Sequence, residues 1–491
     1  MQYAKKLGKQ QVMTMKKLSL LILLFLLVGC SSNKIESLEF IGDLSEDYNM
    51  QILYQNESDL FSSMAYKDTK MMAIDASVLL ERLPVLYNEN SVYLRSSDGF
   101  MNCLDSESLD KTYIGYSDDY GWAFVSEKHP PNSGIRNISE ILIVNDTEDV
   151  NHSYGLNIVD AKGETTLHYS VGELYLQPYR SFAYLDGVSE KNSDGVIYKV
   201  PGMKLKKVLS LDDLIENESN ISLIMTDEGD YEYMFSEGYI ELVGSKLNYI
   251  VPETYDVYNG LQGIMINPPQ VTVMDTFEAV RSNLSEPVMV IFIDGLSYRQ
   301  YEVLTTRDAF MNQLSSEKAN TVFKPVTNAG YAAMITGQKP KVNGVLDRSY
   351  RTINVPDIFS IATDNNKSSV IIEGDIKILD TSVEPILNLD RNNNGYTDDE
   401  IFETALQHLE NDFVFVHFHS LDEFGHDYGD MNEKTLDQLM LLDGYVKELV
   451  NRWDGHVIIT SDHGMHTTNE GGNHGEFRYE DLIIPFMWGD F

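Results

Sequence analysis

Aspartate and histidine residues recur near the ends of apolar runs in the C-terminal part of this sequence. Some come directly after a run and others lie further along the chain. They are Asp294, Asp422, His426, Asp462, His463 and His474. Carboxylate oxygen and imidazole nitrogen together suit Zn²⁺ or a similar divalent ion. The residue types therefore predict a metal-binding site.

Thr327 is the candidate nucleophile. We expect a helix to begin near it, which would put its hydroxyl at the positive end of that helix. A metal ion and a helix N-terminus both lower the cost of an alkoxide and attract a phosphate. Taken alone, Thr327 would be interpreted as a helix N-cap. Together with the candidate ligands, it indicates the chemistry of phosphate esters.

Strands must bring these residues together, because the residues are far apart in the sequence. Continuous apolar runs lie at residues 288–293, 370–372, 413–416 and 457–459, separated by helical patterns. Such runs are typical of a parallel sheet with helices on both faces, in which chemistry gathers at the carboxyl ends of the strands. We therefore expect an α/β domain over residues 280–491, led in by a helix at residues 271–284.

With these residues in place, the sequence from Val288 to Phe491 resembles the alkaline phosphatase superfamily, in its type I phosphodiesterase/nucleotide pyrophosphatase branch. The matching motifs, in chain order, are Asp294-Gly295, Thr327 nine residues before Thr336-Gly337, Asp422-x-x-Gly-His426, Ser461-Asp462-His463-Gly464 and His474-Gly475. The resemblance implies an alkaline-phosphatase-like, mostly parallel sheet with helices on both faces.

The resemblance also implies two divalent ions, expected to be Zn²⁺ with Mn²⁺ as the alternative. The implied ligands of one ion are Asp294, Thr327, Asp462 and His463, and those of the other are Asp422, His426 and His474. Thr327 would attack phosphorus and form a phosphoenzyme that water then hydrolyses. The expected substrate is a phosphate ester or a small nucleotide-like molecule.

Two departures from the family pattern leave the reaction open. The stretch after Thr327 is Asn-Ala-Gly-Tyr where the family often has Phe-Pro-Asn-His, and Arg348 stands near the place of a phosphate-binding Asn. An Arg there can clamp a more highly charged phosphate with two hydrogen bonds. One alternative is therefore a phosphomonoesterase or phosphoryl-transfer enzyme. The other is a surface binding protein with an inactive hydrolase domain.

We expect three further polar residues in this region to have structural roles. His417 and His419 share a strand face but match no family ligand. Asp443 lies in a helical pattern, where we expect a surface or capping carboxylate.

Residues 390–396, Asp-Arg-Asn-Asn-Asn-Gly-Tyr, resemble the start of a calcium loop. An EF-hand loop needs Glu at its twelfth position, where this chain has Ile401, and Glu400 comes one place early. The alternative, which we favour from the sequence, is a plain turn followed by a capping box of Thr397 and Glu400. That box would open a helix at residues 401–409.

The N-terminus predicts export. Lys16 and Lys17 precede an apolar run, residues 18–28, that is too short to span a bilayer and is followed by Gly29 and Cys30. The pattern resembles the bacterial lipobox, whose cysteine is lipidated; a plain signal peptide with a chance cysteine is the alternative. We expect a signal peptide at residues 1–29, a lipid anchor at Cys30 and a location on the extracytoplasmic face of the cell membrane.

Composition indicates the structural class of the regions before residue 271. Residues 30–60 are polar and acidic and predict a tether, and residues 61–270 predict a β-rich α+β region. Within it, the stretches 73–109 and 203–240 are either two copies of one small unit or alike by chance. Cys103 is expected in the core. The formal net charge of −39 argues against nucleic-acid binding.

Overall fold

The C-terminal region forms an eight-stranded sheet with the order β20-β22-β29-β26-β21-β25-β23-β24. Its strands are β20 (Val271–Thr272), β21 (Val288–Ile293), β22 (Ser315–Asn320), β23 (Ser369–Glu373), β24 (Ile386–Leu387), β25 (Phe413–Phe418), β26 (His456–Thr460) and β29 (Ile483–Asp490). Only β29 runs antiparallel to its neighbours, β22 and β26. The predicted, mostly parallel sheet is confirmed.

The computed structural model describes residues 37–104, 109–129, 134–147, 150–178, 180–191, 197–215, 221–235, 238–254 and 256–491. The predicted signal peptide and Cys30 lie outside these residues. None of the helices in the described ranges is long and apolar enough to cross a membrane.

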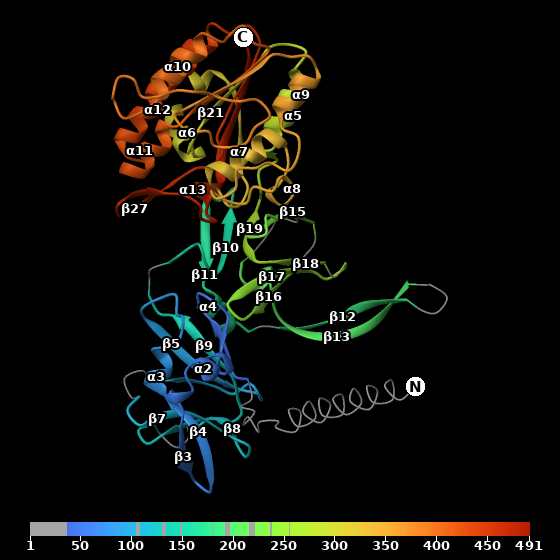
Figure 1. Cartoon of the computed structure of the whole chain (residues 1–491), viewed down its shortest axis with the longest axis vertical. Helices are drawn as coiled ribbons and strands as arrows, with labels where there is room; N and C mark the ends of the chain where they lie inside the picture. Colours follow the sequence, from blue (N-terminus) through green and yellow to red (C-terminus); the bar gives the residue numbers. More distant parts are fainter. Residues whose placement is uncertain are drawn as a thin grey trace, which may run out of the picture. The chain divides into compact units, whose positions relative to one another are not determined.

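Helices cover both faces of the C-terminal sheet, which explains its continuous apolar runs. Alternate residues of β21 enter two separate cores, Val290 and Phe292 on one face and Met289 and Ile291 on the other. The first core includes residues of α5 (Asp275–Asn283), α7 (Thr327–Thr336) and α9 (Ile358–Asp364). The second includes residues of α6 (Tyr298–Thr305), α10 (Asp398–Leu406) and α12 (Glu433–Val450) (Figure 1).

Short elements complete this region. They are η5 (Phe310–Gln313), α8 (Pro340–Asn343), α11 (Ser420–Tyr428), α13 (Tyr479–Leu482) and the hairpin of β27 (His466–Thr468) and β28 (Gly471–Asn473). The lead-in helix α5 begins at Asp275 and not at 271, because Val271 and Thr272 pair with β22.

The residues that directly precede the C-terminal region form two sheets, and residues of the first sheet share a core with the C-terminal region. The first has the order β11-β10-β19-β14-β15 and the second β12-β13-β16-β17-β18. Their elements are β10 (Leu156–Asp160), β11 (Thr165–Tyr169), α4 (Val171–Leu176), β12 (Arg180–Lys191), β13 (Ile197–Ser210), η4 (Leu211–Asp213), β14 (Ser222–Thr226), β15 (Tyr231–Met234), β16 (Tyr239–Val243), β17 (Lys246–Val251), β18 (Asp256–Asn259) and β19 (Leu261–Ile266).

The domain boundary expected near residue 270 therefore needs correction. Residues 143–491, with two short earlier segments, form one compact unit. Val159, Leu223 and Met265 lie in the same core as β21, and the Asn320 amide donates to the Tyr231 hydroxyl at 2.6 Å. The Pro-rich stretch 267–269 is thus a turn within one compact unit.

The other compact unit is built mainly from residues 47–84 and 91–142. Its sheets have the orders β2-β1-β9-β5-β6 and β3-β4-β7-β8, and β1 and β9 run on into the other unit. The elements are β1 (Glu39–Gly42), β2 (Tyr48–Asn49), α2 (Met50–Asn56), η1 (Ser58–Leu60), β3 (Ser62–Tyr66), β4 (Thr69–Asp75), α3 (Ala76–Leu80), β5 (Asn90–Ser96), β6 (Met101–Leu104), β7 (Thr112–Ser117), β8 (Gly121–Ser126) and β9 (Ile138–Asn145).

The strand order repeats along the chain. In the sheet β2-β1-β9-β5-β6, the strand that comes last in the sequence, β9, lies between the pairs β2-β1 and β5-β6. In the sheet β11-β10-β19-β14-β15, the last strand, β19, lies in the same way between β11-β10 and β14-β15. The stretches 73–109 and 203–240 contain the corresponding hairpins, β5-β6 and β14-β15. A common topology thus accompanies the similarity that we noted in the sequence.

Two expectations for the N-terminal residues were wrong. Residues 37–60 are folded and not a tether, because Leu38, Phe40, Met50 and Leu53 are buried despite the polar residues between them. Cys103 is exposed on β6, since its side chain alternates with that of the buried Leu104.

Asp443 on α12 holds the start of η5. Its carboxylate accepts hydrogen bonds from the backbone N–H groups of Phe310 (2.7 Å) and Met311 (2.8 Å) and is buried.

Asp443→Ala would leave both donors unsatisfied, so we expect the free energy of unfolding to fall by about 1–3 kcal/mol in urea denaturation. Asp437→Ala, on the same helix but exposed, should cost less than about 1 kcal/mol. Equal losses would contradict this role.

Candidate metal centre

The structure brings the predicted metal ligands together at the carboxyl-terminal edge of the parallel strands. Asp294 directly follows β21, and Asp462 follows β26 within two residues. Asp422 and His426 lie on α11, which follows β25, and His474 follows β28. Parallel strands end at the same edge of a sheet, so distant residues meet there.

One group of ligands surrounds the Nε2 atom of His463. This atom lies 3.4 Å from Asp294 Oδ1, 3.2 Å from Asp462 Oδ2 and 3.4 Å from Thr327 Oγ1. Asp294, Asp462 and His463 are buried. The residues expected around one ion are thus neighbours in the structure.

The second group centres on Asp422. Its Oδ2 lies 3.4 Å from Nε2 of His426, and its Oδ1 lies 3.6 Å from Nε2 of His474. The side chains of Asp422 and His426 are 17% and 34% exposed, whereas that of His474 is fully buried. This side of the site therefore faces solvent. Asp422 also lies within reach of Asp294 and His463, so the two groups adjoin.

The three predicted histidine ligands share one arrangement. Each Nδ1 donates to a backbone carbonyl oxygen: His426 to Gly472 (3.1 Å), His463 to Gly464 (2.9 Å) and His474 to Pro325 (2.9 Å). A carbonyl can only accept, so the proton sits on Nδ1 and Nε2 keeps its lone pair. All three lone pairs point toward carboxylates, which is the orientation of metal-ligating histidine.

The carboxylates also fit a bound cation. Asp294 Oδ1, Asp422 Oδ1 and Asp462 Oδ2 are buried and have no hydrogen-bond partner in the part of the chain that the structure describes. Buried acceptors without donors are costly. Divalent ions among these oxygens and the Nε2 atoms would satisfy all of them, so the residues present fit metal ions.

The electrostatics show the strain of this cluster. Burial raises the pKa of Asp462 to about 8, and the negative charge of Asp294 adds to the rise. Burial and the nearby His463 lower the pKa of His474 to about 3. Burial would raise the pKa of Asp294 as well, but hydrogen bonds from His417 and His419 hold it well below its usual value.

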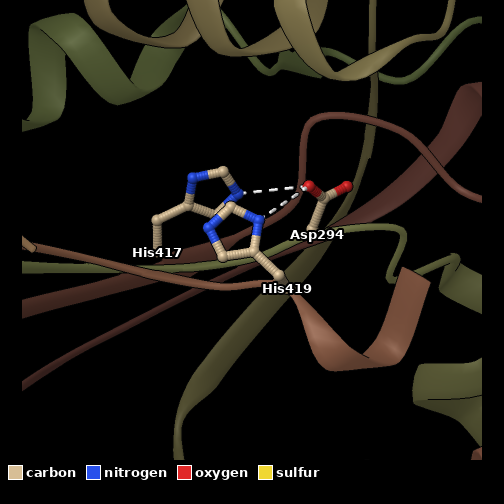
Figure 2. A group of neighbouring side chains, drawn as sticks. All are labelled: Asp294, His417 and His419. Atoms are coloured by element: carbon tan, nitrogen blue, oxygen red, sulfur yellow. Dashed lines mark hydrogen bonds and ion pairs between the residues drawn. The ribbon is translucent and has the colours of Figure 1, made fainter. Parts of the chain in front are cut away.

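His417 and His419 both contact Asp294, which the sequence did not lead us to expect (Figure 2). Nε2 of His417 lies 3.2 Å from Asp294 Oδ2, and Nδ1 of His419 lies 3.7 Å from the same oxygen. The N–H of Gly374 donates to Nε2 of His419 at 3.3 Å, so the proton of that ring is on Nδ1. His419 therefore presents a donor to Asp294.

Behind His417 lies a second buried carboxylate. Glu373 Oε1 is 3.9 Å from Nδ1 of His417 and accepts a hydrogen bond from the Tyr331 hydroxyl at 2.9 Å. Tyr331, Glu373, His417 and Asp294 thus form a series of polar contacts. The series uses Oδ2 of Asp294 and leaves its Oδ1 available to an ion. Asp294, His417 and His419 could also hold a metal by their spacing, but the donor on His419 favours hydrogen bonding. A carboxylate ending an apolar strand, Glu373, was the sequence signal for this series.

Thr327 is the first residue of α7 and not its N-cap. Val326 occupies the cap position and no side chain caps the helix, so the interpretation of Thr327 as a simple N-cap was wrong. Gly330 lets α7 approach the site, because a Cβ there would lie 2.3 Å from the backbone oxygen of Asp462. A side chain at this position would therefore clash with the backbone of Asp462.

Arg348 reaches the second group. Its guanidinium contacts Nε2 of His474. A guanidinium can only donate, which again makes that nitrogen an acceptor. The predicted phosphate clamp therefore lies beside a predicted metal ligand.

One comparison with known protein families found a match in the C-terminal region. Residues 382–484 match the model of the type I phosphodiesterase/nucleotide pyrophosphatase family. This part of the chain is therefore similar to that family. The matched range includes Asp422, His426, Asp462, His463 and His474, whereas Asp294 and Thr327 precede it.

Similar solved structures include murine ectonucleotide pyrophosphatase/phosphodiesterase 5 in complex with AMP, at 14% identity and a TM-score of 0.31. Another is phosphonoacetate hydrolase from Sinorhizobium meliloti 1021, at 15% identity and a TM-score of 0.30. The matches cover 38% and 37% of this chain and 59% and 56% of those chains, less than two thirds of either. No curated protein matches the chain in sequence.

Metal affinity should depend on pH through Asp462. Its pKa of about 8 means that a proton competes with the ion at lower pH. We expect the Zn²⁺ affinity of the metal-free protein to rise from about pH 6 to about pH 8, with protons released on binding. Competition with a chromophoric chelator measures this. An affinity independent of pH over that range would contradict the role of Asp462.

Proposed function

We propose that the C-terminal region is a two-metal phosphodiesterase/nucleotide pyrophosphatase-like hydrolase whose nucleophile is Thr327. The observation that carries the proposal is the position of the Thr327 hydroxyl. It lies at the first residue of α7 and 3.4 Å from the Nε2 atom of His463, in a cluster whose buried carboxylate oxygens have no hydrogen-bond partner among the described residues. A hydroxyl in this setting is suited to attack on phosphorus.

Asp294, Thr327, Asp462 and His463 would hold one ion, and Asp422, His426 and His474 the other. We expect Zn²⁺, with Mn²⁺ as the alternative, because the ligands combine carboxylate, hydroxyl and imidazole groups. Two such ions neutralise phosphate charge and lower the pKa of a hydroxyl.

The chain's own residues supply the remaining steps. The N-terminal N–H groups of α7 attract the phosphate. Thr327 loses its hydroxyl proton to solvent, its oxygen bonds to phosphorus, and the bond from phosphorus to the leaving oxygen breaks. The leaving oxygen takes up a proton from solvent. Water then cleaves the phosphothreonine, which releases the phosphate product and restores the hydroxyl. The buried His417 and Glu373 keep Asp294 in one orientation throughout.

Arg348 favours a second candidate of the same superfamily. Its guanidinium lies at the site and can bind two oxygens of a dianionic phosphate. The positive charge of Arg348 would stabilise the dianionic phosphate of a monoester, the substrate of a phosphomonoesterase or phosphoryl-transfer enzyme, more than the monoanionic phosphate of a diester. The complete set of ligands argues against an inactive binding protein, because loss of catalysis removes the reason to keep them.

A lipid anchor at Cys30, on the extracytoplasmic face of the cell membrane, remains part of the proposal. Its support is the apolar run and the cysteine that follows it in the sequence. The substrate would then be a phosphate ester or small nucleotide-like molecule outside the cytoplasm.

Thr327→Ala should abolish hydrolysis, lowering kcat by on the order of 10³-fold or more because the nucleophile is lost. We would assay bis-p-nitrophenyl phosphate and p-nitrophenyl phosphate with added Zn²⁺, and measure the metal content of each variant. Thr327→Ser, which keeps a hydroxyl, is the matched control and should retain activity. Full activity in Thr327→Ala would refute the mechanism.

Arg348→Ala separates the two candidates. Faster cleavage of the diester, little changed in Arg348→Ala, would support the diesterase. Faster cleavage of the monoester, lost in Arg348→Ala, would support the monoesterase and make Arg348 the phosphate clamp.

A further inference from the structure

The loop between β24 and α10 has a structure that the proposed hydrolase does not explain. Asp390 accepts hydrogen bonds from the backbone N–H groups of Asn394 (3.2 Å) and Gly395 (2.9 Å). Gly395 has a φ of +96°, which lets the chain reverse there. The side chains of Asp390, Asn392 and Asn394 thus alternate around a tight turn, as oxygen ligands do in calcium loops.

The capping box that we expected after this loop does not form. Thr397 makes no capping hydrogen bond, and α10 begins at Asp398 and not at 401. The Glu400 side chain turns back instead, and its Oε1 accepts from the backbone N–H of Arg391 at 2.8 Å. The predicted capping box was therefore wrong.

The carboxylate of Glu400 lies against the loop and has one unsatisfied oxygen. The residue is 3% exposed, and its Oε2 is buried without a hydrogen-bond partner among the described residues. Its other oxygen is bonded to the second residue of the loop, so the group faces the loop. A buried carboxylate oxygen without a donor is costly unless a cation satisfies it.

Asp399 accepts hydrogen bonds from the side-chain amides of Asn392 and Asn394. We propose that residues 390–400 bind a calcium ion through the side-chain oxygens of Asp390, Asn392, Asn394 and Glu400. All of these groups offer hard oxygen atoms in an adaptable loop, which suits calcium and not zinc. Glu400 stands one place before the usual glutamate of an EF-hand.

Calcium at this loop would also steady the helix that carries two catalytic-metal ligands. The ring of Tyr396 stacks on Phe424 of α11, with centroids 4.7 Å apart. Asp398 accepts from the N–H groups of His419 (2.9 Å) and Ser420 (3.1 Å) at the start of α11. Calcium binding does not depend on the proposed hydrolase activity, but it connects to α11, where Asp422 and His426 lie.

The test is calcium titration of the full chain after its catalytic ligands have been saturated with Zn²⁺. Isothermal titration calorimetry should show one Ca²⁺ bound with a Kd between about 10⁻⁶ and 10⁻³ M, and Ca²⁺ should raise the thermal midpoint. Asp390→Ala and Glu400→Gln should lose this binding. Asp364→Asn, which removes one exposed charge at the end of α9, should keep it.

Three results would overturn the proposal. They are no Ca²⁺ binding by the wild type at millimolar concentration, unchanged binding in both loop variants, and an equal response to Mg²⁺. The wild-type titration decides the matter even where a variant fails to fold. Hydrolysis of either p-nitrophenyl ester is a separate measurement, so failure of the hydrolase proposal and failure of calcium binding are distinguishable.

Discussion

The site depends on three imidazole rings whose protons are fixed by backbone carbonyls. His426, His463 and His474 each donate Nδ1–H to a carbonyl oxygen and direct the Nε2 lone pair at a carboxylate. A change of backbone position at Gly464, Gly472 or Pro325 would turn the ring with it. The loops after the strands must therefore be held rigidly for the ligands to converge.

The sheet provides that rigidity. The strands β21, β25 and β26 are apolar on both faces and are packed in two cores, so their carboxyl ends are fixed relative to one another. Asp294, at one such end, is further held by the series that includes His417, Glu373 and Tyr331. One oxygen is thereby used for orientation while the other stays available to an ion.

The sequence predicted the strands of the C-terminal sheet well, for a physical reason. A strand buried on both faces needs a continuous apolar run, and the run at residues 288–293 matches β21. Contacts between distant residues were less predictable. His417 was assigned a structural role because nothing in the sequence shows that its strand places it against Asp294, and Glu373 was missed for the same reason.

Predictions from local sequence patterns were wrong where contacts with distant residues determine the structure. Thr397 and Glu400 have the spacing of a capping box, but the Glu400 carboxylate bonds to Arg391 instead. The Pro-rich stretch at 267–269 suggested a boundary, but Met265 and Val290 share a core across it. Residues 37–60 are polar on average, yet four buried apolar side chains, Leu38, Phe40, Met50 and Leu53, are enough to fold them.

Anomalous diffraction at the zinc edge, on crystals of the full chain grown with Zn²⁺, tests the central claim most directly. The account predicts one peak among Asp294, Thr327, Asp462 and His463 and another among Asp422, His426 and His474. It predicts none between Asp294, His417 and His419, where we assign hydrogen bonds. Zinc there, or a single peak that excludes Thr327, would contradict the two-metal site with its threonine nucleophile.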